Sequence, residues 1–170
     1  MKKKLLAVID MQNDFIDGAL GTKEAQSIVP LVKERILRAQ AEGETIVFTR
    51  DTHGSDYLSS PEGKSLPVPH CIKGTHGWEI SADLPAAEKI IDKPTFGSVS
   101  LAEHVRKAGY EKVEIVGLCT DICVISNALL LKAFCPETEI SVRADCCAGV
   151  TPESHQTALS AMCACQIKIV

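Results

Sequence analysis

The chain has 170 residues, of which 45% are hydrophobic and 24% charged, the balance of a folded domain rather than a disordered chain. Its formal net charge is −4 and no basic patch is visible, which excludes a nucleic-acid partner. The apolar run at 5–9 ends at Asp10, and no run approaches the roughly eighteen residues of a membrane span. We therefore expect a single domain over residues 1–170 that is cytoplasmic and has no membrane partner.

Short apolar runs alternate with helical patterns along the chain. Strands are predicted at 5–9, 45–49, 89–92, 113–117, 139–143 and 166–170, and helices at about 24–42, 100–109, 121–134 and from 151 onward. Ser100-x-x-Glu103 has the form of a capping box for the second of these helices. The alternation predicts an α/β fold: a three-layer α/β/α, Rossmann-like domain with a six-stranded, mostly parallel sheet. The irregular segment 51–80 is long enough to indicate a functional loop.

Eight cysteines require an explanation of their own. They lie at positions 71, 119, 123, 135, 146, 147, 163 and 165. Four disulfides would suit a short secreted chain with an export signal, which this sequence does not resemble. The pairs at 146–147 and 163–165 also lack the spacing of a zinc knuckle. Most of these residues are therefore expected to be small buried hydrophobes.

Polar residues follow four of the predicted strands. Asp10, Asp51, Lys93 and Cys123 come just after the first, second, third and fourth strand. Ligands of a doubly wound sheet bind beyond the carboxyl ends of its strands, so these side chains are expected to converge. We call Asp10, Lys93 and Cys123 the strand-end cluster. A buried thiol, a capping acid and a surface amine would explain each residue alone, but the joint placement favours an active site.

The strand-end cluster has the parts of a nucleophilic site. Cys123 is predicted in the first turn of a helix, where free N–H groups and the helix dipole should lower the pKa of its thiol. Those N–H groups could also hold an oxyanion. Asp10 would take the thiol proton, and Lys93 would stabilise the thiolate.

The segment 51–80 contains a second set of candidate residues. Asp51, His53 and His70 supply a carboxylate and two imidazoles, and Glu62 lies between them as a tentative fourth ligand; we call these four residues the metal group. Such a set is common for divalent metal ions. We expect zinc, with iron and manganese as alternatives.

Three segments resemble the isochorismatase-like cysteine hydrolases: VIDMQNDF at 8–15, DKPTF at 92–96 and GLCTDICV at 117–124. The resemblance covers essentially the whole chain and implies a six-stranded parallel sheet. It implies that the strand-end cluster is the catalytic triad. It also implies a cis peptide between Leu118 and Cys119, with the backbone N–H groups of Cys119 and Cys123 as the oxyanion hole.

Within that family, RDTH at 50–53 and PHCIKGTHG at 69–77 are similar to the nicotinamidase branch. This implies a metal ion at the metal group and hydrolysis of nicotinamide to nicotinate and ammonia through a cysteine thioester. One position departs from that branch, because Pro67 stands where an aromatic residue often stacks on the substrate ring. Phe15, Phe96 and Tyr57 are the candidates to supply that face instead.

Two other functions remain open at this level. The first is a cysteine hydrolase of another small amide or carbamoyl compound, with a vestigial metal group. The second is a non-enzymatic α/β regulatory module, although a receiver's phosphoacceptor position and a glycine-rich dinucleotide loop are both missing. In the favoured hypothesis the partner is a small-molecule amide. The apolar segment 121–134 suits either a core helix or the interface of a homo-oligomer.

Overall fold

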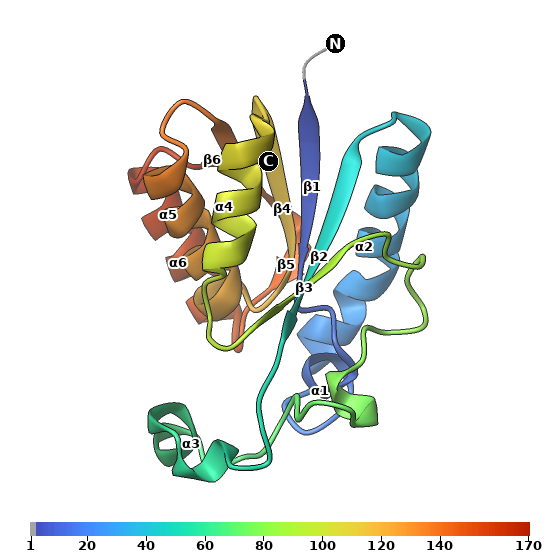
Figure 1. The fold of residues 1–170 in the computed structure, drawn as a ribbon, viewed down its shortest axis with the longest axis vertical. Helices are drawn as coiled ribbons and strands as arrows, with labels where there is room; N and C mark the ends of the chain where they lie inside the picture. The colour runs from blue at the N-terminus through green and yellow to red at the C-terminus, as the bar shows by residue number, and fades with distance from the viewer. Residues whose placement is uncertain (1–2) are drawn as a thin grey trace.

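The structure, a computed structural model, describes residues 3–170 and is built on one six-stranded sheet (Figure 1). The strands are β1 Lys4–Ile9, β2 Thr45–Asp51, β3 Ile90–Lys93, β4 Lys112–Leu118, β5 Glu139–Ala148 and β6 Lys168–Ile169. Their order is β3-β2-β1-β4-β5-β6, and every neighbouring pair is parallel. The α/β fold class and the six strands predicted from the sequence are confirmed.

Helices cover both faces of the sheet. They are α1 Asn13–Ile16, α2 Lys23–Ala41, α3 Pro61–Ser65, α4 Val99–Ala108, α5 Ile125–Phe134 and α6 Pro152–Ala164. In Figure 1, α2 lies on one side of the sheet and α4, α5 and α6 lie on the other, which gives the three layers expected. None of the helices in the described range 3–170 has the length and apolarity that crossing a membrane requires.

Alternation along β1 explains why both faces are covered. Leu5, Ala7 and Ile9 belong to the core under α4, α5 and α6, whereas Leu6 and Val8 belong to the core under α2. Successive side chains of a strand point to opposite faces, so an unbroken apolar run has to be buried on both sides. The central strand therefore requires two helix layers.

Two local predictions are wrong. The helix predicted from Ser100 begins at Val99, because Ser98 is its N-cap and accepts a hydrogen bond from the amide of Leu101. The helix predicted from 121 is also interrupted. Residues Thr120–Val124 form a π-helical turn, and α5 starts only at Ile125.

The order of the strands places the site. The chain runs outward from β1 to β2 and β3 and then returns to β4, on the other side of β1. Ligands of such sheets bind at this reversal point, beyond the carboxyl ends of the strands. In Figure 1 that end of the sheet carries α1, α3 and the loops beside them.

Candidate active site

Asp10 directly follows β1 and is fully buried. Its backbone has a φ of 47°, in the left-handed region that few non-glycine residues adopt. The Thr49 hydroxyl donates to Asp10 Oδ1 over 2.6 Å, and this fixes the carboxylate. A backbone conformation of this kind is common where a site requires an unusual side-chain direction.

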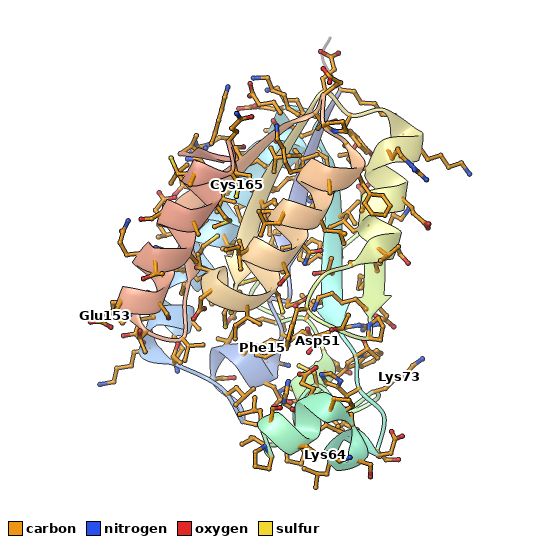
Figure 2. All side chains as sticks on the ribbon, turned by 90° about the vertical axis from the view of Figure 1, so that its left-hand side faces the viewer. Phe15, Asp51, Lys64, Lys73, Glu153 and Cys165 are labelled. Carbon is orange, nitrogen blue, oxygen red and sulfur yellow. The ribbon has the colours of Figure 1, made fainter. Side chains whose placement is uncertain are left out.

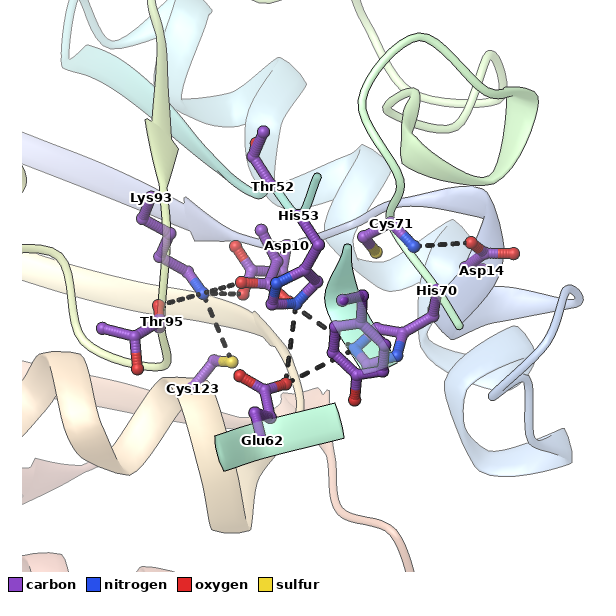
Figure 3. Close-up of polar contacts among 12 residues, drawn as sticks. Asp10, Asp14, Thr52, His53, Glu62, His70, Cys71, Lys93, Thr95 and Cys123 are labelled. Atoms are coloured by element: carbon purple, nitrogen blue, oxygen red, sulfur yellow. Dashed lines mark hydrogen bonds and ion pairs between the residues drawn. The ribbon is translucent and has the colours of Figure 1, made fainter. Parts of the chain in front are cut away.

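Lys93 ends β3 and connects the acids of the site (Figure 3). Its Nζ lies 2.7 Å from Asp10 Oδ2, 3.2 Å from Asp51 Oδ1 and 3.4 Å from Cys123 Sγ. The ammonium also donates to the carbonyl oxygen of Thr95 over 3.0 Å. Only 1% of Lys93 is exposed, so its charge is balanced by these partners rather than by water. The structure thus brings the strand-end cluster together.

Cys123 lies in the π-helical turn that follows β4, after the cis peptide expected between Leu118 and Cys119. The buried Asn127 on α5 donates to the carbonyl oxygen of Cys123 over 2.8 Å and to that of Phe96 over 3.1 Å. One amide side chain therefore connects the turn that carries Cys123 to the segment after β3.

Burial reverses the expected ionisation of the thiol. Desolvation and the neighbouring Asp10 carboxylate raise the pKa of Cys123 well above its usual value, although Lys93 acts in the opposite direction. Burial also raises the pKa of Asp10, against the effect of Lys93. The expectation that a helix N-terminus lowers the thiol pKa is wrong here, because Cys123 is sealed in a turn before α5. The thiol therefore keeps its proton at rest and needs a base.

The metal group forms a compact set of ligand atoms. Each of its four residues offers one such atom, and these atoms all lie within 4.8 Å of one another. Asp51 Oδ2 lies 2.9 Å from His53 Nε2 and 3.8 Å from His70 Nε2. Glu62, which comes from α3, lies 3.5 Å and 3.7 Å from the same two nitrogens.

The donor chemistry of His70 fits a metal ion. Its Nδ1 lies 2.8 Å from the carbonyl oxygen of Val68, which can only accept, so Nδ1 carries a proton. In the neutral imidazole, Nε2 then has a free lone pair, and it faces the carboxylates of Asp51 and Glu62. A free lone pair that faces two carboxylates suits a cation between them, and a second ring hydrogen bond of this type is usual for metal-binding histidines.

A cavity connects the strand-end cluster with the metal group. Its empty volume is about 340 Å³ including the mouth, and its apolar lining includes Phe15, Leu66 and Phe96. Figure 2 shows Phe15 and Asp51 at the same end of the sheet, next to the small helix α3. Tyr57 does not line this cavity in the described chain. Its ring instead packs against those of His53 and His70, with centroids 4.7 and 5.0 Å away.

Several residues of the site were not predicted from the sequence. Gln12, Thr49 and Asn127 each hold a member of the site through a buried hydrogen bond. Gln12 belongs to the segment that carries the family resemblance, so its place in the motif was a usable signal. Thr49 and Asn127 stand beside other polar residues, Arg50 and Ser126, so no local pattern distinguishes them.

The fold and this site together define an α/β enzyme of the hydrolase class, with a thiol, a carboxylate and an ammonium at the reversal point of the sheet. The chain belongs to the isochorismatase domain family, which it matches over residues 4–170.

Known proteins of this family are similar over nearly the full chain. The uncharacterized isochorismatase family protein PncA of Bacillus subtilis is 32% identical, over 93% of each chain. The nicotinamidase/pyrazinamidase of Mycobacterium tuberculosis is 28% identical, over 98% of each. The crystal structure of a Pyrococcus horikoshii pyrazinamidase in complex with zinc superimposes with a TM-score of 0.87 at 35% identity, covering 99% of this chain and 98% of that one.

Proposed function

We propose that this protein hydrolyses nicotinamide to nicotinate and ammonia through a thioester on Cys123. The observation that carries the proposal is the contact between Lys93 and Asp51, which joins the strand-end cluster and the metal group at one cavity. A nucleophile beside a metal group suits an amide whose ring carries a metal-binding nitrogen. Relatives named as nicotinamidases and pyrazinamidases support the same reaction.

In this mechanism Asp10 is the base and acid, and Cys123 is the nucleophile. Asp10 takes the thiol proton as sulfur attacks the carboxamide carbon, and the backbone N–H groups of Cys119 and Cys123 hold the oxyanion. Asp10 then returns the proton to the leaving nitrogen, and ammonia departs. Next it takes a proton from water as the water oxygen attacks the thioester carbon, the C–S bond breaks, nicotinate is released, and the proton returns to the Cys123 sulfur. Lys93 offsets the negative charge throughout.

The metal group would hold a divalent ion, and zinc is the ion we propose. Two imidazoles and two carboxylates are a ligand set that zinc accepts, as do iron and manganese. When bound, the ion supplies a Lewis-acidic position for the pyridine nitrogen. The zinc in the Pyrococcus horikoshii structure supports this choice. Phe15 and Phe96 line the cavity and are the ring contacts we propose, with Leu66 also facing it.

We also infer a cytoplasmic location and a homo-oligomer. Eight free cysteines suit a reducing compartment, because an oxidising one would favour disulfides. On α5, Leu129 is 40% exposed and offers an apolar contact to a second copy. Light scattering after size-exclusion chromatography tests the oligomer.

The experiment that tests the proposed function measures ammonia release from nicotinamide. The wild-type protein should release ammonia, Cys123→Ala should release none, and Cys163→Ala, which removes an exposed thiol on α6, should match the wild type. Chelation should abolish the activity, and zinc, iron or manganese should restore it to different extents.

Three results would count against the proposal. Activity that survives chelation would exclude a role for the metal. Full activity of Cys123→Ala would exclude the thioester. If reduced, metal-loaded protein releases no ammonia from nicotinamide but does from another small amide or carbamoyl compound, the alternative substrate class is correct, and the missing aromatic residue at Pro67 would explain it.

A further inference from the structure

Three consecutive residues after β1, Gln12, Asn13 and Asp14, each form hydrogen bonds with the segment 51–80, which carries the metal group. The amide side chain of Gln12 donates to the carbonyl oxygen of Asp51 over 2.8 Å and accepts from the Asp51 amide over 2.7 Å. It also donates to the carbonyl oxygen of Trp78 over 2.9 Å. Gln12 is fully buried, so it holds the backbone of a metal-group residue from both sides without competition from water.

Asn13 and Asp14 form further hydrogen bonds with the same segment. Asn13 donates through its side chain to the carbonyl oxygen of His76 over 2.8 Å, and its backbone amide donates to that of Glu79 over 3.0 Å. Asp14 Oδ2 accepts from the amide of Cys71 over 2.8 Å (Figure 3). The three side chains therefore reach the segment 51–80 at its start, middle and end.

The Asp14 contact acts on the residue next to a proposed ligand. Cys71 has a φ of 48°, a left-handed conformation that an L-residue keeps only when its surroundings enforce it. Its amide belongs to the peptide that follows His70, so the bond to Asp14 orients the backbone from which His70 projects. Phe15, the next residue along α1, packs on the His70 ring with centroids 5.5 Å apart.

Gly77 adapts the segment to this carboxylate. A Cβ atom at position 77 would lie 2.1 Å from Asp14 Oδ2, far inside the contact distance of two atoms. The glycine thus lets the backbone close over Asp14. This contact explains why a glycine stands at position 77 of the PHCIKGTHG motif, although this glycine has no part in the proposed reaction.

We propose that Gln12, Asn13 and Asp14 are positioning residues that set the metal group relative to Asp10. Asp10 lies two residues before Gln12, the N-cap of α1, and Asn13 and Asp14 are the first two residues of that helix, so the base is close along the chain to the residues that hold the metal segment. The proposal rests on the proposed function in one respect, the choice of substrate. If the ion binds the ring nitrogen, a fixed distance between the ion and Cys123 would select amides by the position of that nitrogen in the ring.

Zinc affinity tests the proposal without any substrate. Competition with a chromophoric chelator should show that Asp14→Ala weakens zinc binding at least about tenfold, the range seen when the outer partners of metal ligands are removed. Asp14→Asn keeps an acceptor for the Cys71 amide and should bind zinc nearly as the wild type does. The cobalt(II) absorption spectrum should change in Asp14→Ala and be restored in Asp14→Asn.

Thr22→Ala is the matched control. Thr22 caps α2 by accepting from the amide of Ala25, so its loss should lower the melting temperature and leave zinc affinity unchanged. Asn13→Ala, at a half-buried side chain, provides a second variant if Asp14→Ala does not fold, and it should weaken zinc binding in the same direction. Wild-type zinc affinity in the folded variants, or a wild-type protein that binds no zinc, would overturn the proposal.

A substrate comparison separates this proposal from the proposed function. With zinc in excess, the ratio of kcat/KM for nicotinamide to that for isonicotinamide, whose ring nitrogen is one position further from the amide, should fall in Asp14→Ala. An unchanged ratio would overturn the selection by ring position. If the wild type hydrolyses neither amide, the proposed function fails, while the zinc measurements still decide whether the three residues position the metal group.

Discussion

At the residue scale, the central feature is a buried ammonium between two carboxylates and a thiol. Burial opposes the charge of Lys93, but the carboxylates of Asp10 and Asp51 raise its pKa, so it remains protonated. Its single positive charge offsets Asp10 and Asp51, both almost fully buried. Charges of this kind are stable only as a set, because removing one leaves the others without compensation in a medium of low polarity.

Lys93→Met should therefore destabilise the protein as well as inactivate it. Breaking a buried ion pair by removing one partner typically lowers the free energy of unfolding by about 3–5 kcal/mol, because the remaining charge is uncompensated. Urea unfolding of the metal-free protein measures this. Lys112→Met is the control, since Lys112 pairs with Glu139 at the surface and its loss should matter by less than about 1 kcal/mol. Equal effects of the two substitutions would contradict a charge-balancing role for Lys93.

Asp10→Asn tests the base while keeping the shape of the side chain. The Thr49 hydroxyl can still donate to position 10, but an amide cannot accept the thiol proton. We expect kcat to fall by about 10²–10⁴, the usual contribution of general acid–base catalysis, with zinc content unchanged. Steady-state kinetics and metal analysis of one preparation measure both. A kcat within a few-fold of the wild type would assign proton transfer to another group.

Sequence reasoning located the strand-end cluster because strand ends of a parallel sheet share one edge, and it located the metal group from the ligand types in the long segment 51–80. It misjudged the thiol pKa because that value depends on burial, which no local pattern reports. The same limit hid Gln12, whose contacts at Asp51 and Trp78 lie 39 and 66 residues away along the chain. The chemical type of each site residue could be predicted from the sequence. The degree to which the fold shields each residue from water could not.

At the element scale, the reversal point depends on how closely β1 and β4 approach. Gly117 on β4 has a φ of 119°, and a Cβ there would lie 2.1 Å from the carbonyl oxygen of Ile9. The register also shifts between Ile115 and Gly117 where β4 pairs with β5. This glycine permits the contact that sets Asp10, which follows Ile9, beside the turn that follows β4.

Gly117→Ala should be much more damaging than Gly109→Ala. Both glycines have positive φ, but a Cβ at Gly109 meets nothing within 4 Å. The alanine at 109 should therefore lower stability by about 1 kcal/mol, the strain of a left-handed residue. The alanine at 117 adds a backbone clash and should lower it by about 3 kcal/mol or more. Denaturant unfolding compares them, and similar losses would show that the close approach is not needed.

Helix starts were the least predictable elements, for a physical reason. Ser98 and Ser100 are both good N-cap residues, and what favours Ser98 is a long-range contact, in which its backbone amide donates to Asn127 Oδ1. The π-helical turn at Thr120–Val124 is likewise invisible to an apolar periodicity. In contrast, Thr151 begins α6 as predicted, because its cap and its partner Ser154 lie within one turn.

At the scale of the whole molecule, a set of ion pairs joins α2 to the sheet at the end away from the active site. Arg35 on α2 lies 2.6 Å from both Glu44 and Glu114, and Arg143 on β5 lies 2.9 Å from Glu114. These contacts connect the helix layer with β4 and β5. They fix α2 against the sheet, while its apolar side, with Val32 and Ile36, fills the core.

This arrangement predicts how stability depends on acid. Burial alone would raise the pKa of Glu114, but hydrogen bonds from Arg143 and Arg35 hold it below its usual value. A glutamate whose pKa is lower in the folded state stabilises the fold fully above its unfolded pKa of about 4.3. That contribution is lost as the pH falls through the lower, folded value.

Glu114→Gln should therefore destabilise the protein at pH 7 and do so less and less as the solution is acidified. We expect a loss of about 2 kcal/mol at pH 7, below that of a fully buried pair because Glu114 is partly exposed. Urea unfolding of metal-free protein between pH 7 and pH 3 measures it without a contribution from the ion. Glu103→Gln, at an exposed position on α4, should follow the wild type throughout. Curves for Glu114→Gln and the wild type that stay parallel down to pH 3 would show that this carboxylate does not govern the acid limit of the fold.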